Sequence, residues 1–217
     1  MSVRIMLADD HAILREGLRG LLEKHRGFEV VADAADGRTA VVLARRHQPD
    51  VIVMDISMPG MNGAEATRQL AKELPRTRVV ALSVHVDRRY VESMLGAGAA
   101  AYLRKDCVSE ELIHAIECVM RGDVYISPKI VALMSKHIAV TSQKGNAGIT
   151  PQLSAKEREV LQLLAEGCTS KEISDRLFIS MKTVEKHRQH ISEKLGINSV
   201  AELTKYAIRE GITSVEE

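Results

Sequence analysis

Aromatic residues, cysteines and net charge are all scarce in this sequence of 217 residues. Tryptophan is absent and aromatic residues make up 3%, so a hydrophobic core must be built from aliphatic side chains. The three cysteines, Cys107, Cys118 and Cys168, form no CxxC pair, which argues against a disulfide framework and against a zinc site. Because the net charge is only +1, any nucleic-acid site must be a local cluster of cations.

Long apolar runs are missing as well. No apolar run reaches the roughly 18 residues of a membrane span, and Asp9 and Asp10 interrupt the first one, so we expect neither a membrane segment nor a signal peptide. The odd number of cysteines fits a reducing, cytoplasmic setting. The length favours two domains of about 100–150 residues each.

The stretch from Val51 to Asp55 carries the clearest strand signal. Its apolar residues run without interruption into Asp55, and Pro59 and Gly60 then end the run. We therefore expect Asp55 at the carboxyl end of a central parallel strand, the edge where open α/β sheets bind ligands. Strands also end in Asp without any function, and this stretch alone does not decide between the two.

Strand and helix patterns alternate through the first half of the chain. Strands are expected at residues 3–8, 28–32, 51–55, 78–83 and 99–103, and each is followed by a helical pattern. Asp36 and Ser109 are the expected caps of the second and last of these helices. This alternation predicts a doubly wound α/β domain with a five-stranded parallel sheet and helices on both faces.

The pattern changes after Pro128. A short helix is expected from Ile130 to Ile138, and residues 140–152 are rich in the small and polar types of a flexible linker. Every later pattern is helical, at 154–166, 171–177, 182–195 and 200–209, with Ser154 and Glu157 spaced as a capping box. We expect an α/β domain at 1–125, a linker at 126–149 and an all-α, four-helix domain at 150–217.

Polar side chains follow four of the predicted strands. Asp9, Asp10, Asp55, Ser83 and Lys105 all fall at carboxyl ends, which meet at one edge of a doubly wound sheet. Three carboxylates packed together repel one another, and Mg²⁺, which prefers oxygen ligands, would relieve that repulsion. One carboxylate could then attack phosphorus to form an acyl phosphate, with Lys105 and Ser83 holding the transferred oxygens.

These acids, together with Met58-Pro59-Gly60, Gly63, Ser83 and Lys105, resemble the receiver domain of two-component response regulators over residues 3–122. The resemblance implies a flavodoxin-like fold in which Asp55 accepts a phosphoryl group from a sensor histidine kinase. It implies Mg²⁺ ligation by the side chains of Asp10 and Asp55, by Asp9 directly or through water, and by the Ser57 carbonyl. Ser83 would move to the phosphate and Tyr102 would rotate inward behind it.

Two positions beside this pattern stand out. Receivers commonly carry a proline after the lysine, in a cis peptide bond, whereas Asp106 follows Lys105 here. His85, two residues beyond Ser83, either borders the phosphoryl group and affects its hydrolysis or is an ordinary loop histidine.

The helical patterns at 171–177 and 182–195 fit a helix-turn-helix. On a helical wheel, Val184, His187, Ile191 and Leu195 share one face, and Lys182, Glu185, Lys186, Gln189 and Glu193 share the other. Three basic residues, one acid and two histidines lie between Met181 and His190, a local positive charge suited to phosphates. A charged face that is simply solvated remains the alternative.

Leu153-Ser-Ala-Lys-Glu-Arg-Glu-Val-Leu, Lys171-Glu-Ile, Thr183-Val and Lys194-Leu195-Gly196 resemble the LuxR-type helix-turn-helix over residues 150–212. The resemblance implies that residues 182–195 lie in the major groove of double-stranded DNA, with Glu185, Lys186 and Gln189 facing bases. Lys182, Thr183, His187 and Arg188 would contact phosphates, and the segment Thr169-Ser170-Lys171 would anchor the preceding helix. The last helix would carry dimer contacts.

The two resemblances together identify the chain as similar to response regulators of the NarL/FixJ group. They imply a transcription regulator rather than an enzyme, with a sensor histidine kinase, promoter DNA and a second phosphorylated copy as partners. The unmodified receiver is expected to cover the helix at 182–195 and so to keep it from DNA. Three alternatives stay open: a haloacid-dehalogenase phosphatase, a regulator that works by protein contact without phosphorylation, and a redox sensor at Cys107.

Overall fold

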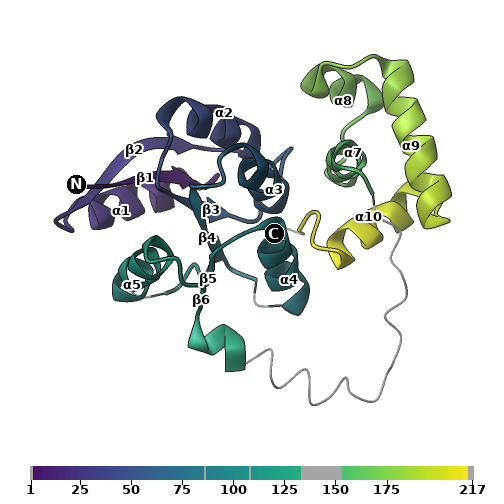
Figure 1. The fold of residues 1–217 in the computed structure, drawn as a ribbon. Coiled ribbons are helices and arrows are strands. Elements are labelled where there is room, and N and C mark those ends of the chain that lie inside the picture. Colours follow the sequence, from purple (N-terminus) through teal and green to yellow (C-terminus); the bar gives the residue numbers. More distant parts are fainter. Residues whose placement is uncertain (1, 86, 108, 133–152, 215–217) are drawn as a thin grey trace. The chain divides into compact units, whose positions relative to one another are not determined.

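The computed structural model describes residues 2–85, 87–107, 109–132 and 153–214 (Figure 1). The chain divides into two compact units, Met1–Gln143 and Lys144–Glu217. The division falls inside the range where the linker is expected. In the described ranges no helix is both long and apolar enough to cross a bilayer.

The first unit is built on a parallel sheet. Its strands are β1 (Val3–Ala8), β2 (Phe28–Ala34), β3 (Val51–Asp55), β4 (Arg78–Ser83), β5 (Ala101–Arg104) and β6 (Tyr125–Ile126). They lie in the order β2-β1-β3-β4-β5-β6, and every neighbouring pair is parallel. The expected count of five strands was wrong by one. Two residues of β6 are too few to show a strand period in the sequence.

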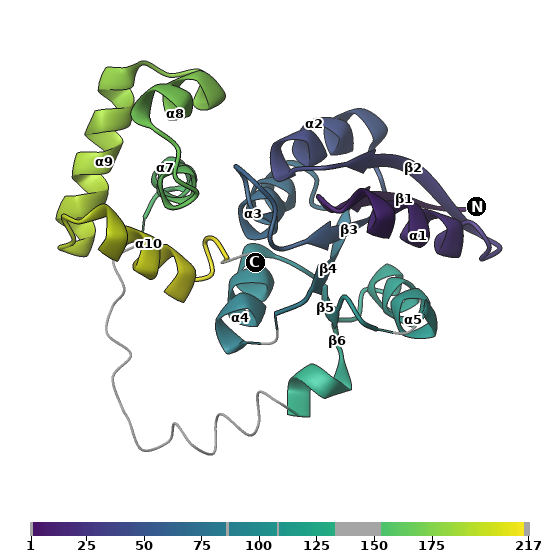
Figure 2. The same ribbon diagram turned by 180° about the vertical axis from the view of Figure 1, so that it is seen from behind.

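Helices cover both faces of this sheet, as expected. They are α1 (Ala12–Leu22), α2 (Gly37–His47), α3 (Gly63–Glu73), α4 (Arg88–Ala97) and α5 (Ser109–Met120). Met6 and Met54 point into a core formed with α2, α3 and α4, whereas Leu7 and Val53 point into a second core formed with α1 and α5. Figures 1 and 2 show the same two layers of helices. All five residues of β3 are buried, because helices pack on both of its sides.

Of the two helix caps predicted from the sequence, one is present in the structure and the other is not. Asp36 accepts a hydrogen bond from the backbone N–H of Thr39, as a cap should. Ser109 is instead the first helical residue of α5.

Residues 126–132 belong to the first unit rather than to a free linker. Ile126 pairs in β6, Ser127 and Ile130 are buried, and residues 128–132 are helical. The rest of the helix expected from Ile130 to Ile138, and the linker at 140–152, lie outside the described residues.

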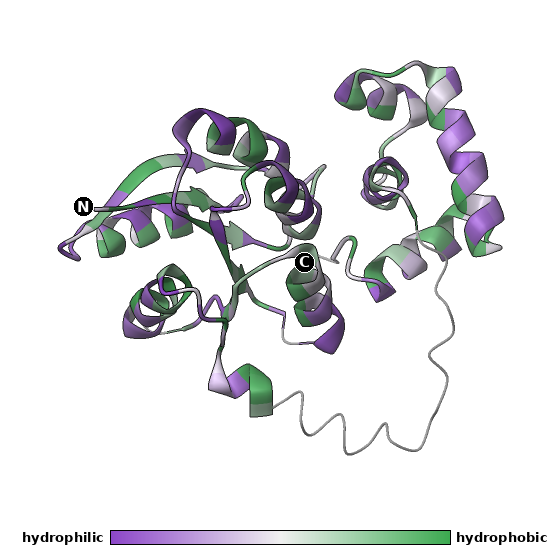
Figure 3. Cartoon of the chain, in the orientation of Figure 1, coloured by the Kyte–Doolittle hydropathy of each residue, from purple (hydrophilic) through white to green (hydrophobic). Residues whose placement is uncertain are grey.

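The second unit is the expected set of four helices: α7 (Ala155–Ala165), α8 (Ser170–Leu177), α9 (Met181–Leu195) and α10 (Val200–Arg209). Val184 and Ile191 of α9 are fully buried in the shared aliphatic core. The predicted polar face of α9 is exposed: it consists of Lys182, Glu185, Lys186, Gln189 and Glu193. The helical wheel therefore distinguished the buried face of α9 from its exposed face correctly. Most of α9 has the purple colour of hydrophilic residues in Figure 3.

The start of α7 carries the predicted capping box. The Ser154 hydroxyl accepts a hydrogen bond from the Glu157 N–H, and the Glu157 carboxylate accepts one from the Ser154 N–H at 2.7 Å. The same carboxylate lies 2.7 Å from the Lys194 ammonium of α9. The cap therefore also ties α7 to α9.

The Ser154→Ala variant should destabilise the second unit by about 1 kcal/mol, because one capping hydrogen bond is lost. Ser199→Ala is the matched control, since Ser199 occupies the same position in α10 but its side chain makes no capping hydrogen bond. Urea unfolding of both variants measures the difference. Equal costs at the two positions would show that the capping bond contributes nothing.

Candidate functional site

Three predicted residues meet at the carboxyl edge of the sheet. The Lys105 ammonium, just beyond β5, lies 2.8 Å from Oδ2 of Asp9 and 2.8 Å from Oδ2 of Asp55. Both carboxylates are buried, and they stand at the ends of the neighbouring strands β1 and β3. The convergence predicted from strand ends is therefore present.

A fourth and a fifth residue complete the cluster. Nδ1 of His11 lies 2.7 Å from an oxygen of Asp10 and 3.2 Å from one of Asp9. The side-chain ligand atoms of Asp9, Asp10, His11 and Asp55 all lie within 4.8 Å of one another. Sequence reasoning did not single out His11. Its only signal is that it directly follows the two acids.

The electrostatics of the cluster depend on burial. Burial raises the pKa of Asp55 to about 6, although the ammonium of Lys105 acts in the opposite direction. Burial also works against the charged form of Lys105, but hydrogen bonds to Asp55 and Asp9 outweigh it and raise the pKa of that ammonium. Asp55 is thus an unusually basic carboxylate held beside a firmly charged lysine.

Stability without divalent cations should fall as the pH rises through the range between 3.8, the ordinary pKa of Asp55, and about 6. In that range the folded protein keeps a proton on Asp55 that the unfolded chain releases, so deprotonation penalises folding by about 3 kcal/mol. Asp55→Asn removes the group. In buffer with a chelator, the stability of wild type relative to this variant should therefore drop between pH 4 and pH 7, as urea unfolding measures. A constant difference would contradict the raised pKa.

The acidic cluster fits a hard divalent cation. Oδ2 of Asp9 and Oδ1 of Asp10 are shielded from solvent, and their close contacts are with charged or basic groups: Lys105 at 2.8 Å from the first and His11 at 2.7 Å from the second. Carboxylate oxygens with spare lone pairs are the ligands that Mg²⁺ prefers. Ser57 lies in the loop after β3, where its backbone N–H donates to Asp55 Oδ1 at 3.3 Å.

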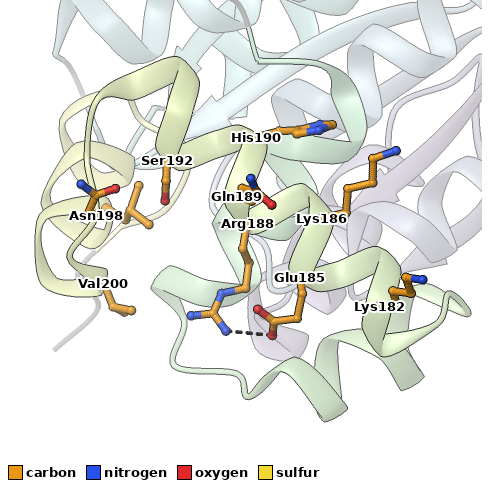
Figure 4. Close-up of a pocket in the computed structure, with 10 residues that line it drawn as sticks. Lys182, Glu185, Lys186, Arg188, Gln189, His190, Ser192, Asn198 and Val200 are labelled. Carbon is orange, nitrogen blue, oxygen red and sulfur yellow. Dashed lines mark hydrogen bonds and ion pairs between the residues drawn. The ribbon is translucent and has the colours of Figure 1, made fainter.

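The predicted DNA-contact residues lie on α8 and α9. Lys171, Lys182 and Lys186 are exposed, as is Gln189, and His187 is half-buried. Together with the start of α10, α9 borders a hollow of about 660 Å³, lined by residues shown in Figure 4. The Thr183 hydroxyl is 2.8 Å from that of Ser180, whose side chain also caps α9. Thr183 is therefore partly engaged within the protein.

Two family models match this chain. The response regulator receiver domain matches residues 5–117, and the luxR family of bacterial regulatory proteins matches residues 151–207. Oxygen regulatory protein NreC of Staphylococcus carnosus (strain TM300) is 41% identical over 212 residues, which is 96% of this chain and 98% of that protein. The chain belongs to the LuxR-family response regulators. Both family resemblances seen in the sequence are thereby confirmed.

Solved structures of response regulators are similar to this one. A LuxR-family two-component response regulator from Aurantimonas sp. SI85-9A1 has 37% sequence identity and a TM-score of 0.61, covering 64% of this chain and 99% of that chain. The response regulator ChrA of a heme-sensing two-component system has 32% identity and a TM-score of 0.55, covering 97% of this chain and 98% of that chain.

Ser83 and Tyr102 of this response regulator are linked through one loop. The Ser83 hydroxyl accepts a hydrogen bond from the His85 N–H at 2.9 Å, and the Tyr102 hydroxyl donates to the His85 carbonyl at 3.0 Å. Tyr102 is completely buried, so it already occupies the inward position that the sequence resemblance reserved for the activated state. The His85 ring stacks on the Tyr90 ring, with the ring centroids 4.4 Å apart.

The loop after Lys105 is held by an ion pair instead of a proline. The guanidinium of Arg104 lies 2.7 Å and 2.8 Å from the two carboxylate oxygens of Asp106. No cis peptide bond occurs among the described residues, and the Lys105–Asp106 bond is accordingly trans.

The loop of the response regulator that follows Asp55 is closed by Gly63, the first residue of α3. Its N–H donates to the Ile56 carbonyl at 2.8 Å, and a Cβ placed on Gly63 would lie only 2.0 Å from the Asp55 carbonyl oxygen. Glycine is therefore the residue that lets α3 begin directly beneath the acidic cluster.

Proposed function

We propose that Asp55 accepts a phosphoryl group from a sensor histidine kinase, and that this event controls the binding of promoter DNA through α9. The observation that supports the proposal is the buried Asp9–Lys105–Asp55 arrangement, with Lys105 at 2.8 Å from each carboxylate. The carboxylate of Asp55 would attack phosphorus, an acyl phosphate would form, and the bond from phosphorus to the donor would break.

Mg²⁺ is the proposed cofactor of this step, held by the side chains of Asp10 and Asp55, by Asp9 directly or through water, and by the Ser57 carbonyl. When bound it would neutralise the clustered acids and the phosphoryl oxygens. Lys105 would hold one phosphoryl oxygen as its ammonium moves from Asp55 to the new anion. Ser83 would donate a hydrogen bond from its hydroxyl to another phosphoryl oxygen. It would first lose the hydrogen bond that it accepts from the His85 N–H.

For DNA we propose that Lys182, Thr183, His187 and Arg188 contact phosphates, with Lys171 at the start of α8. Lys186 and Gln189, together with Glu185, occupy the positions that the sequence resemblance gives as base-facing; of these, Gln189 is suited to pair with adenine. The partners are therefore a kinase, double-stranded promoter DNA and a second phosphorylated copy of the chain. We place the protein in the cytoplasm, where these partners would be.

Two of the three alternatives left by the sequence receive little support. A haloacid-dehalogenase phosphatase needs a second acid two residues after the nucleophile, and Ser57 occupies that position. Redox sensing at Cys107 needs a thiolate, whereas burial raises the pKa of that thiol to about 11.

Incubation of the full-length protein with Mg²⁺ and acetyl phosphate tests the proposal. Intact mass should show one added phosphoryl group, and enrichment from a library of randomised DNA duplexes should be stronger after the treatment than before it. Sustained turnover of a phosphoester would favour the enzyme instead. Comparing the isolated segment Leu153–Glu217 with the unmodified full-length protein tests masking, which requires tighter binding by the segment.

A further inference from the structure

Three side chains form a closed triangle where α8 meets α9. Ser170 is the first residue of α8, and its hydroxyl donates to the Glu185 carboxylate at 2.6 Å. One guanidinium nitrogen of Arg188 donates both to the Ser170 hydroxyl at 2.8 Å and to the same Glu185 oxygen at 3.1 Å. Figure 4 shows the contact between Glu185 and Arg188 as a dashed line. The triangle thus links the first turn of α8 to α9.

The triangle answers an electrostatic problem at this junction. The amino end of a helix carries a partial positive charge, so the end of α8 repels the guanidinium of Arg188. Glu185 supplies the acceptor oxygen that makes the approach favourable, and its position three residues before Arg188 places both on one side of α9. Without this acceptor, only the hydrogen bond to the Ser170 hydroxyl would hold Arg188 at the end of α8.

The same geometry counts against Glu185 as a base reader. One of the two carboxylate oxygens, Oε1, already accepts two hydrogen bonds, which hold the carboxylate against Ser170 and Arg188. An acid on a face that also carries Lys182 and Lys186 repels DNA phosphates as well, so its presence requires a compensating role.

We propose that Glu185 is a positioning residue: it holds the Arg188 guanidinium at the amino end of α8, oriented for a DNA phosphate, and reads no base. The proposal rests on the DNA-binding function proposed above. It predicts that what matters at position 185 is the acceptor oxygen, not the charge.

The test compares Glu185→Gln and Glu185→Ala in the full-length protein treated with acetyl phosphate, using the randomised duplex library. Glu193 provides matched controls, because it is exposed on the same face and its carboxylate is bonded to Gln189 rather than to Arg188. Glu185→Gln should leave the preferred base at every position unchanged, and should tighten binding as much as Glu193→Gln does.

Glu185→Ala should also keep the base preferences, but it should bind every sequence more weakly than Glu185→Gln. The slope of log K against log salt should be about 0.9 smaller than that of Glu193→Ala, because one cation–phosphate contact is lost. A changed base preference at one position in Glu185→Gln would overturn the proposal, as would equal salt slopes for the two alanine variants.

A measurement without DNA separates this inference from the proposed function. If wild type enriches no sequence, DNA binding by this chain fails, but the triangle can still be tested. Unfolding midpoints of Ser170→Ala, Glu185→Ala and the double variant should be non-additive when the two residues act as a unit. Additive effects would show that the triangle does not hold Arg188, and would overturn the positioning role.

Discussion

The Asp55→Asn variant is expected to gain no phosphoryl group from acetyl phosphate under conditions in which wild type gains one. The amide has no nucleophilic oxygen of comparable strength, and no other acid shares the position of Asp55 at the end of the central strand. Intact mass measures the result directly. The loss should be complete rather than partial, because the change removes the attacking atom and not merely a supporting contact.

Asp106→Asn is the matched control for this loss. Asp106 follows Lys105 in the chain, and its exposed carboxylate is bonded to Arg104 rather than to the acidic cluster. It removes the same charge from the neighbouring loop and should leave uptake intact. Asp55→Asn should also remain folded at pH 7, because it removes a buried carboxyl group whose deprotonation opposes folding. Phosphoryl uptake by Asp55→Asn would move the acceptor to another residue.

Gly63→Ala should destabilise the first unit by at least about 2 kcal/mol, the upper part of the range for overpacked sites. The added Cβ would lie 2.0 Å from the Asp55 carbonyl oxygen, and a backbone atom cannot rotate out of its way as a side chain could. Relief requires a shift of the loop between β3 and α3. We therefore expect phosphoryl uptake to fall as well, in the fraction of protein that stays folded.

Gly20→Ala is the opposite case in the same unit. Gly20 lies in α1, a Cβ there meets nothing within 4 Å, and its φ is not positive. The free energy of unfolding of this variant should be higher by up to about 1 kcal/mol, because alanine favours the helix and loses less conformational entropy on folding than glycine does. Urea unfolding of both variants decides the matter. A Gly63→Ala protein as stable as wild type would mean that the loop accommodates the methyl group.

The carboxyl-edge cluster was predictable because strand ends of a parallel sheet converge whatever their separation in the sequence. Asp9, Asp55 and Lys105 therefore needed only correct strand assignment. The amphipathic faces of α9 were predictable for a similar reason, since helical periodicity is local.

Features that depend on tertiary contacts were not predictable. The position of His11 over the acids is set by a loop, and the inward orientation of Tyr102 is set by one hydrogen bond to the His85 carbonyl. The bond between Ser170 and Glu185 joins two helices that packing alone brings together. The strand β6 was too short to leave a pattern in the sequence.

That short strand has a consequence for signalling between the two units. Ile126 of β6 is paired with Tyr102 of β5, the Ser127 N–H donates to the Tyr102 carbonyl at 3.0 Å, and Ile130 is wholly buried just beyond. The segment that follows α5 is thus hydrogen-bonded to β5, the strand that ends just before Lys105. If Lys105 changes partner in the proposed phosphorylation step, any displacement of β5 that results would act directly on residues 126–130.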